Sequence, residues 1–438
     1  MTPRAVPGLA LSLGLSLLAL VACGPGSQPS PAAATVAGTP AAAAAATKPA
    51  GQTPAAATTP AAAAAASAVP AAAASAVPAA AASPLAAASP SAVGAPAAPA
   101  LSVSIAGPFP GEAKNLTGAG ATFPGPLYAK WFDAYQKVTQ VQVNYQAIGS
   151  GGGIKGIQDQ TIDFGASDAP MTDEQLAAAK GGEIYHVPTA LGAIVISYNV
   201  PEAKDKLKFT GDTIAGIYTG DIAKWNDPKL VADNPDLANV NKDIVTVHRS
   251  DGSGTTFGFT DYLSTVNADW KSRVGKGTSV NWPGGLGGSG NPGVAGEVQQ
   301  TPYAVGYIEL IYAAQNKISY GLVKNKAGKF VDPSLDSVTA AAASSANVVP
   351  ADLRFSIVDA PGDAAYSIST ATWLLTYKNL NDQAKGLALT RMLWWVTHEG
   401  QQLNKDVLYA TVPPELTTKS EQFIKQITVE GKPVFPGK

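Results

Sequence analysis

The chain has 438 residues, a formal net charge of −2 and only 14% charged residues. It contains no run of basic residues, which argues against a nucleic-acid partner because binding a polyanion requires a concentrated cationic surface. Its single cysteine, Cys23, excludes an internal disulfide framework and a cysteine-based metal site. No cluster of carboxylates and histidines suggests a metal centre, so we expect neither a metal nor a cofactor.

The first residues have the pattern of a secretion signal. The run from Leu9 to Val21 is apolar but too short to span a membrane, and residues 20–23 read LVAC, which resembles the lipobox of bacterial lipoproteins. We therefore expect residues 1–22 to be a signal peptide and Cys23 to be lipidated. The protein would then be extracytoplasmic and anchored to the cell membrane, facing a periplasm or a cell-wall space. A chance cysteine after a signal core is the alternative.

A low-complexity segment follows. From Gly24 to about Ala100 the chain is almost entirely Ala, Pro, Ser, Thr and Gly, and Lys48 is its only charged residue. Frequent prolines interrupt the alanine runs as helices, and aromatic residues for a core are absent. We expect residues 23–112 to form a disordered tether for a globular part that starts at Ala113.

The globular part opens with three strands that each lead into a glycine-rich turn. Residues 116–124, LTGAGATFP, predict a strand, a bend and a helix over about 126–137, with Thr122 placed to cap that helix or to face an anion. Residues 141–145 predict the next strand, which a glycine-rich loop and a helix follow, with Ser150 at the mouth of the loop.

The third strand ends in a carboxylate. Residues 162–170, IDFGASDAP, predict a short strand and a turn with Asp168 at its tip, and Thr172 then opens a capped helix. Asp168 would be unexpected beside an oxyanion, because a carboxylate repels an anion that brings no proton.

The most distinctive motif is RSDGSGTT at residues 249–256, between a strand and a helix. Its two glycines let the backbone approach a ligand at the helix N-terminus, where unpaired N–H groups and the helix dipole favour an anion. Arg249 adds a planar cation, and Ser253, Thr255 and Thr256 add hydroxyl donors. A β-turn with Asp251 as N-cap is the alternative.

Further strands and helices alternate to the C-terminus, which predicts an α/β architecture whose loops converge on one cleft. The expected strands are residues 185–188, 193–198, 244–248, 305–308 and 373–377. The expected helices are residues 213–218, 222–225, 259–265, 292–299 and 384–397, with a helix and loop in 336–351. We interpret the loop WPGGLGGSG at 282–290 as a structural turn and not a phosphate loop, because no cation accompanies it.

Four ordered motifs together resemble the phosphate-binding protein of the bacterial high-affinity phosphate ABC importer. They are GAGATFP at 118–124, GSGGG at 149–153, DFGASDAP at 163–170 and RSDGSGT at 249–255. The likeness runs from about Leu116 to the C-terminus. It implies an α/β periplasmic-binding-protein fold of type II, with two lobes, two crossovers and the ligand between the lobes. Lobe 1 would comprise residues 113–189 and 366–438, and lobe 2 residues 190–365.

The resemblance also implies the ligand and its contacts. Those contacts would be Thr122, Phe123, Ser150, Asp168, Arg249, Ser253, Gly254 and Thr255. Asp251 would hold Arg249 from behind, and Gly151 stands where relatives often have a further serine. Asp168 would accept a hydrogen bond from hydrogen phosphate and repel sulfate, which carries no proton. A monomer would capture inorganic phosphate and deliver it to the permease subunits of an ABC transporter.

Three other functions remain open from the residues alone. A binding protein for sulfate or molybdate would have no use for an acceptor carboxylate. A phosphate-ester hydrolase is the enzymatic alternative, but Ser150 and Ser253 lie outside a Gly-x-Ser-x-Gly motif, and His186, His248 and His398 show no spacing that singles out a base. A purely structural surface lipoprotein leaves the anion-suited loops unexplained. We therefore expect a binding protein and not an enzyme.

Overall fold

The computed structural model describes residues 105–345 and 349–436. The expected signal peptide, the lipidation site Cys23 and the tether up to residue 104 lie outside the described residues. Among the residues that the structure does describe, no helix combines the length and apolar character needed to cross a lipid bilayer.

The strands are short apart from β4 and β12. They are β1 (Asn115–Gly120), β2 (Gln142–Ala147), β3 (Phe164–Ser167), β4 (Ile184–Tyr198), β5 (Lys208–Phe209), β6 (Val245–Arg249), β7 (Leu286–Gly288), β8 (Ala304–Glu309), β9 (Ser319–Tyr320), β10 (Leu322–Lys324), β11 (Phe330–Val331), β12 (Ser369–Tyr377), β13 (Asn379–Leu380), β14 (Thr428–Val429) and β15 (Lys432–Pro433).

Helices follow most of the strands. The α-helices are α1 (Gly125–Thr139), α2 (Ser150–Gln158), α3 (Asp173–Ala177), α4 (Gly211–Thr219), α5 (Pro228–Val231), α6 (Gly254–Val266), α7 (Ala268–Arg273), α8 (Gly290–Gln300), α9 (Leu310–Asn316), α10 (Leu335–Ser345), α11 (Gln383–Thr397) and α12 (Pro414–Gln426). Within residues 105–345 and 349–436 the structure also contains the 3₁₀ helices η1 (Pro235–Asn239) and η3 (Glu399–Val407).

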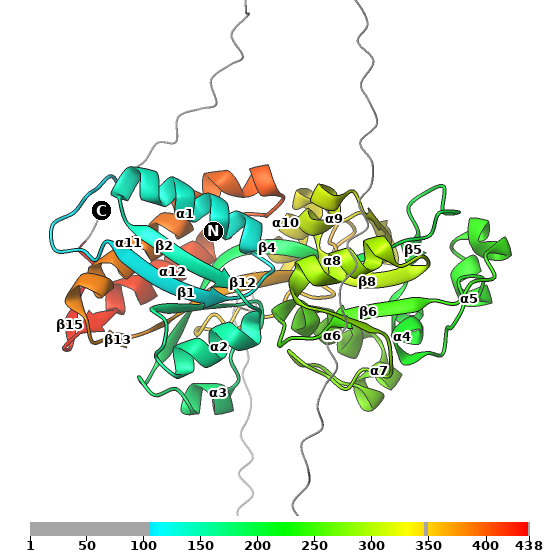
Figure 1. Cartoon of the computed structure of the whole chain (residues 1–438), viewed down its shortest axis with the longest axis horizontal. Coiled ribbons are helices and arrows are strands. Elements are labelled where there is room, and N and C mark those ends of the chain that lie inside the picture. The colour runs from blue at the N-terminus through cyan, green and yellow to red at the C-terminus, as the bar shows by residue number, and fades with distance from the viewer. Residues whose placement is uncertain (1–104, 346–348, 437–438) are drawn as a thin grey trace, which may run out of the picture. The chain divides into compact units, whose positions relative to one another are not determined.

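One nine-stranded sheet runs through the molecule in the order β2-β1-β3-β12-β4-β8-β6-β7, with β9 paired to β4. Its two halves meet in β4, a fully buried strand rich in β-branched residues. Residues 184–193 of β4 pair with β12 in the first sheet half, whereas residues 194–198 pair with β8 in the second (Figure 1). The chain returns beside β4, where the N–H of Ile194 donates to the carbonyl of Ile368 at 2.9 Å. These two crossings confirm the expected periplasmic-binding-protein fold.

The loops that carry the candidate residues lie at the carboxyl ends of parallel strands. In the first sheet half β1 pairs in parallel with β2 and β3, and in the second sheet half β6 pairs in parallel with β7 and β8. Helices α1 and α11 lie on one side of the first sheet half and α2 and α3 on the other (Figure 1). Because parallel strands end at the same edge, this topology gathers the turns before α1, α2, α6 and α8.

One predicted helix is wrong. The stretch from Ile222 to Trp225 is a turn that pairs with the chain before β6. The N–H of Trp225 donates to the carbonyl of Lys242 at 3.0 Å, and the N–H of Ile244 donates to the carbonyl of Ala223 at 2.8 Å. Burial of the Trp225 ring, whose indole N–H binds the carbonyl of Tyr303, anchors this arrangement. Tertiary pairing thus overrides a local helical pattern.

The segment before Ala113, which we expected to belong to the tether, packs on the first sheet half from Ile105 onward. Ile105 is fully buried, and the N–H of Gly107 donates to the carbonyl of Val138 at the end of α1. Glu112 forms an ion pair of 2.7 Å with Arg391 of α11. The globular part therefore begins several residues earlier than the composition indicates.

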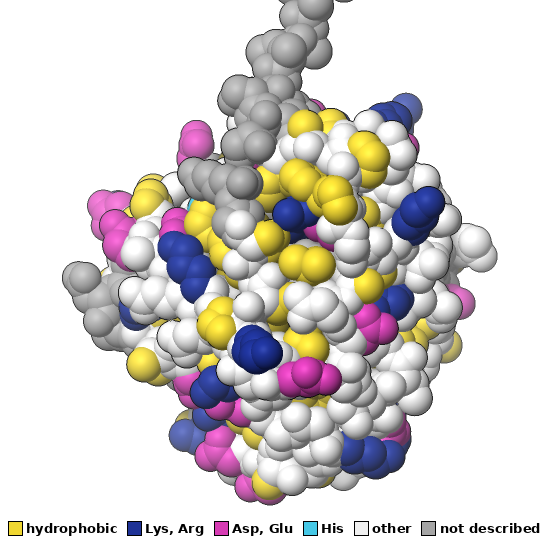
Figure 2. Space-filling view, turned by 90° about the vertical axis from the view of Figure 1, so that its left-hand side faces the viewer, with side chains coloured by type: hydrophobic (Ala, Val, Ile, Leu, Met, Phe, Trp, Pro, Cys, Tyr) yellow, Lys and Arg dark blue, Asp and Glu magenta, His cyan; other side chains and the backbone are white. Residues whose placement is uncertain are grey.

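The surface carries charges of both signs. On the face that lies to the left in Figure 1, Lys and Arg side chains alternate with Asp and Glu side chains between patches of hydrophobic residues (Figure 2). This agrees with the small net charge of −2. An anion site in this protein must therefore depend on local donors.

Candidate functional site

The four predicted loops meet in one buried cluster. The side chains of Thr122, Ser150, Asp168 and Arg249 come from the first and second sheet halves, and each residue is at most 4% exposed. Ser253 and Thr255 are fully buried beside them. Hydrogen bonds link these residues to one another, directly or through Asn291, so the sequence motifs do converge on a common place.

The first direct link joins the loop after β2 to the N-terminus of α6. The N–H of Gly254 donates to Ser150 Oγ at 3.0 Å, and the N–H of Asp168 donates to the same oxygen at 3.2 Å. Gly254 and Thr255 form the first turn of α6, whose N–H groups have no acceptors within the helix. A ligand that accepts from Gly254 would therefore take the place of Ser150 Oγ.

Asp168 supplies the acceptor of the cluster. Thr372 of β12 donates to Asp168 Oδ1 at 2.8 Å, and the Ser150 hydroxyl lies 3.5 Å from Oδ2. Burial raises the pKa of Asp168 to about 7, against the hydrogen bond from Thr372, the charge of Arg249 and the Ser150 hydroxyl. Near neutral pH this carboxyl can therefore be protonated or ionised, and in its ionised form it accepts hydrogen bonds.

Arg249 is held in place by Asp251. The guanidinium Nε donates to Asp251 Oδ1 at 2.8 Å, and a second nitrogen forms an ion pair with Oδ2. Burial raises the pKa of Asp251, but the hydrogen bond and charge of Arg249 outweigh it and leave that pKa below its usual value. The predicted support from behind is present, whereas the N-cap of α6 is Ser253, which accepts from the N–H of Thr256.

Neither Thr122 nor Phe123 caps helix α1 with its side chain. The N-cap position of α1 is Pro124, and no side chain caps that helix. The ring of Phe123 lies in the core, at 5.9 Å and edge-on to Tyr409, so only its backbone can reach a ligand. Among the described residues, the backbone N–H of Phe123 has no acceptor.

Two polar residues of the cluster were not predicted. Asn291, in the first turn of α8, is fully buried and donates from Nδ2 to the hydroxyls of Thr122 and Thr255, both at 3.0 Å. Thr372 binds Asp168 from β12. The glycine run at 282–290 contains β7 and leads into α8, so it repeats the strand, glycine and helix pattern of the other loops. That repetition was the available signal for Asn291.

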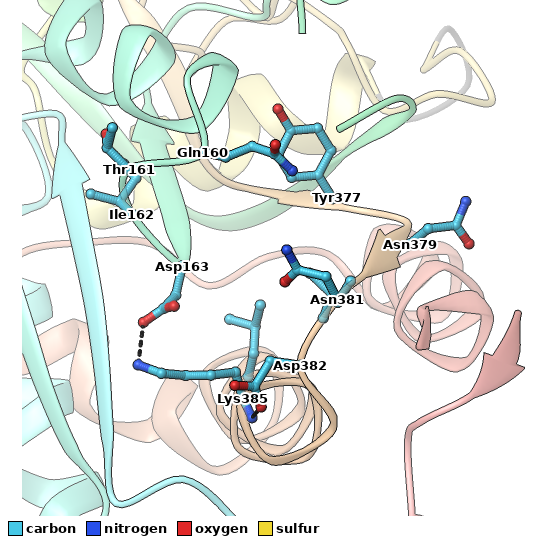
Figure 3. A pocket seen from close by; sticks show the side chains of 11 residues that line it. Gln160, Thr161, Ile162, Asp163, Tyr377, Asn379, Asn381, Asp382 and Lys385 are labelled. Carbon is cyan, nitrogen blue, oxygen red and sulfur yellow. Dashed lines mark hydrogen bonds and ion pairs between the residues drawn. The ribbon is translucent and has the colours of Figure 1, made fainter. Parts of the chain in front are cut away.

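A separate pocket of about 250 Å³ lies beside Asp163 in the first sheet half (Figure 3). Its lining includes Gln160, Tyr377, Asn381 and Lys385, and none of the predicted anion contacts. The Lys385 ammonium lies 2.8 Å from the Asp163 carboxylate, so the two charges neutralise each other. Asp163 also accepts from the N–H of Thr117, which assigns this ion pair a structural role.

Within the described ranges, no group of three or more His, Cys, Asp or Glu side chains could hold a metal ion. His186 is buried and accepts from the N–H of Met171. Burial, with the nearby charge of Arg354, lowers its pKa to about 3.

The fold and the buried cluster are those of a substrate-binding protein of the PBP superfamily. A model of the PBP superfamily domain matches residues 27–389. The phosphate-binding protein PstS of Haemophilus influenzae is 44% identical over 312 residues, covering 70% of this chain and 92% of that protein. The protein of the same name from Xylella fastidiosa is 43% identical over 309 residues, covering 70% of this chain and 84% of that protein. The chain belongs to this PstS family, which confirms the resemblance of its motifs.

A solved structure shares the fold. The phosphate-binding protein from Stenotrophomonas maltophilia superimposes with a TM-score of 0.53 at 16% identity, covering 71% of this chain and 94% of that chain.

Proposed function

We propose that this protein captures inorganic phosphate outside the cytoplasm and delivers it to the permease of an ABC transporter. The observation that carries the proposal is the meeting of one acceptor carboxylate, Asp168, with a set of donors in a buried cluster. The donors are the guanidinium of Arg249, the hydroxyls of Thr122, Ser150, Ser253 and Thr255 and the backbone N–H groups of Phe123 and Gly254. The names of the relatives support phosphate as the ligand.

The charges of the cluster suit a protonated oxyanion. Arg249 is partly neutralised by Asp251, so most of the binding must come from neutral donors placed at fixed positions. Hydrogen phosphate has oxygens for these donors and one hydroxyl for Asp168. Sulfate has no proton at neutral pH and cannot donate to Asp168, and an ionised carboxylate that faces the anion without this hydrogen bond costs about 1 to 3 kcal/mol or more.

Titration calorimetry tests this selectivity on a fragment that begins at Ile105. Phosphate and sulfate are compared on the wild type and on Asp168→Asn at pH 7. We expect the wild type to bind phosphate and reject sulfate. In the variant the amide can donate to either anion, so the difference between its affinities for phosphate and sulfate should be smaller. Equal rejection of sulfate by both proteins would remove the role of Asp168. A wild type that binds sulfate or molybdate in preference to phosphate would overturn the function itself.

The ends of the chain and its lobes complete the proposal. We infer that residues 1–22 are a signal peptide and that lipidated Cys23 holds the protein, as a monomer, to the outer face of the cell membrane. The lobes that close on the ligand would be residues 190–365 and the remainder of the folded part. Metabolic labelling with a fatty acid, in the wild type and in Cys23→Ser, checks the anchor.

We propose no catalytic activity for the cluster. The Ser150 oxygen accepts two backbone N–H groups, which holds it as an acceptor and opposes its use as a nucleophile. Among the described residues, no histidine hydrogen-bonds to Ser150 or Ser253. Phosphate-ester turnover by the purified protein would contradict the proposal.

A further inference from the structure

Asn291 contacts two residues of the proposed phosphate site, on which the role assigned to it depends. Its side-chain orientation is fixed by a neighbour that can only donate. The backbone N–H of Glu309 lies 2.8 Å from Asn291 Oδ1, so this atom must be the carbonyl oxygen. The amide nitrogen therefore faces the opposite way, toward the hydroxyls of Thr122 and Thr255.

These contacts fill the acceptor capacity of Thr122. Its Oγ1 accepts from Asn291 Nδ2 at 3.0 Å and from the backbone N–H of Asn291 at 3.1 Å. A hydroxyl has two lone pairs and one hydrogen, so two incoming N–H groups leave only the hydrogen to be given. No acceptor for that hydrogen exists among the residues that the structure describes.

The hydroxyl of Thr255 also accepts hydrogen bonds and has its hydrogen left to donate. Its Oγ1 accepts from Asn291 Nδ2 at 3.0 Å, and Arg249 Nη1 approaches the same oxygen at 3.4 Å. Its own hydrogen likewise lacks an acceptor in the described part of the chain. One amide thus forces two hydroxyls, from two different loops, to act as hydrogen donors.

We propose that Asn291 is a positioning residue that commits Thr122 and Thr255 to donate to unprotonated oxygens of the bound anion. With these donors on one side and the Asp168 acceptor on the other, the ligand can bind in one orientation, its hydroxyl toward Asp168. Asn291 belongs to the second sheet half and Thr122 to the first, so the same amide also links the two.

A double-mutant cycle tests this role on the full chain, with phosphate affinity measured by titration calorimetry at pH 7. In Asn291→Asp the side chain keeps its shape but presents a second oxygen to the hydroxyls, which would then donate to the introduced carboxylate and not to the ligand. We expect a loss of phosphate affinity of about 100-fold or more, because two hydrogen bonds to a charged ligand are lost.

The single variants T122V and T255V should each weaken phosphate binding by about tenfold or more in the wild type. In the N291D background, however, each should cost less than about threefold, because its hydroxyl no longer serves the ligand. A purely structural role for Asn291 predicts losses that multiply, and that outcome would overturn the proposal. Asn325→Asp is the matched control, since Asn325 is also a buried amide that donates to carbonyls far from the site.

Two further measurements cover a variant that fails to fold and a wild type that binds another anion. If N291D fails to fold by circular dichroism, the phosphate affinity of Asn291→Ser is measured in its place, because the short serine side chain leaves both threonine hydroxyls without the amide that orients them; an affinity equal to that of the wild type would overturn the proposal. If the wild type binds another oxyanion in place of phosphate, the proposed function fails, but the cycle measured with that anion still tests the coupling. If the wild type binds phosphate and the losses multiply, only the role of Asn291 fails.

Discussion

The backbone N–H of Gly254 donates to Ser150 Oγ at 3.0 Å, which joins the start of α6 in the second sheet half to the loop after β2 in the first. The two residues are 104 positions apart in the chain. Their contact shows how closely the site loops approach each other, and it makes the size of residue 254 critical.

The first prediction follows from that approach. A Cβ atom at position 254 would lie 2.5 Å from Ser150 Oγ and 2.6 Å from the Cβ of Asp168. Gly254→Ala should therefore separate the two loops and weaken phosphate binding by about 10- to 100-fold, as measured by titration calorimetry. Gly296→Ala in α8 is the control, because a Cβ there meets nothing within 4 Å. Unchanged affinity in Gly254→Ala would show that the loops need not meet in the bound state.

The second prediction concerns Asp168 and pH in the phosphate-free protein. Burial raises its pKa to about 7, so the protonated form contributes stability that is present below pH 4 and is lost as the pH rises through 7. Asp168→Asn keeps a neutral side chain at every pH. In urea unfolding the free energy of unfolding of the variant should rise relative to that of the wild type by about 4 kcal/mol between pH 4 and pH 8.

Asp159 provides a control of opposite sign. Hydrogen bonds from Lys155 and Lys180 lower its pKa to about 2, so its contribution is present at neutral pH and is lost as the pH falls through that value. Asp159→Asn should therefore cost some stability at pH 7 and less in acid. If the free energies of unfolding of the wild type and of Asp168→Asn differ by the same amount at every pH, the second prediction is contradicted.

The sequence was informative where the chemistry is local. Glycines, a hydroxyl residue and a following helix mark each loop, because a helix N-terminus and a close backbone approach need those residue types at that spacing. The roles of Thr122 and Asp251 were ambiguous at this level. Their actual partners, Asn291 and Arg249, decide between a cap and a site residue.

The missing members of the site depend on tertiary contacts. Asn291 lies 169 residues from Thr122, and Thr372 lies 204 residues from Asp168. We set aside the loop at 282–290 because no cation accompanies it, yet the donor that follows it is a neutral amide. The turn at Trp225 shows the same limit, since its pairing partner is Lys242 and no local pattern reveals it.

The third prediction concerns Glu309, a fully buried carboxyl beside the site. Its Oε2 accepts from the N–H of Ile311 at 2.7 Å and contacts the Tyr409 hydroxyl at 3.1 Å. Burial raises the pKa of Glu309 well above its usual range, which favours the protonated, neutral side chain in the folded protein. Glu309→Gln should then change the free energy of unfolding by less than about 1 kcal/mol, whereas Glu309→Ala should cost about 3 kcal/mol.

The pH dependence of stability distinguishes a protonated Glu309 from a site that merely accepts glutamine in place of glutamate. Protonated Glu309 contributes stability that is lost as the pH rises through its raised pKa. Chemical unfolding of the wild type should therefore become easier relative to Glu309→Gln as the pH rises above the usual pKa range of a glutamate carboxyl. Parallel stability curves, or equal losses in the Gln and Ala variants at pH 7, would show that Glu309 is ionised in the folded protein.

The last prediction concerns the segment before Ala113, which packs on α1 and α11. Glu112 is 3% exposed and pairs with Arg391 at 2.7 Å, and the ring of Phe109 lies 3.4 Å from the same guanidinium. Loss of Glu112 leaves a mostly buried cation without its partner, so Glu112→Gln should lower the free energy of unfolding by about 3 kcal/mol. Lys137→Gln is the control, because its ion pair with Asp133 is exposed and should contribute less than about 1 kcal/mol.

A fragment that starts at Ala113 should lose at least as much stability as Glu112→Gln when compared with one that starts at Ile105. Phosphate affinity should stay the same in Glu112→Gln, because this segment contacts helices and not the site loops; equal melting temperatures of the two fragments would show that the folded part does begin at Ala113.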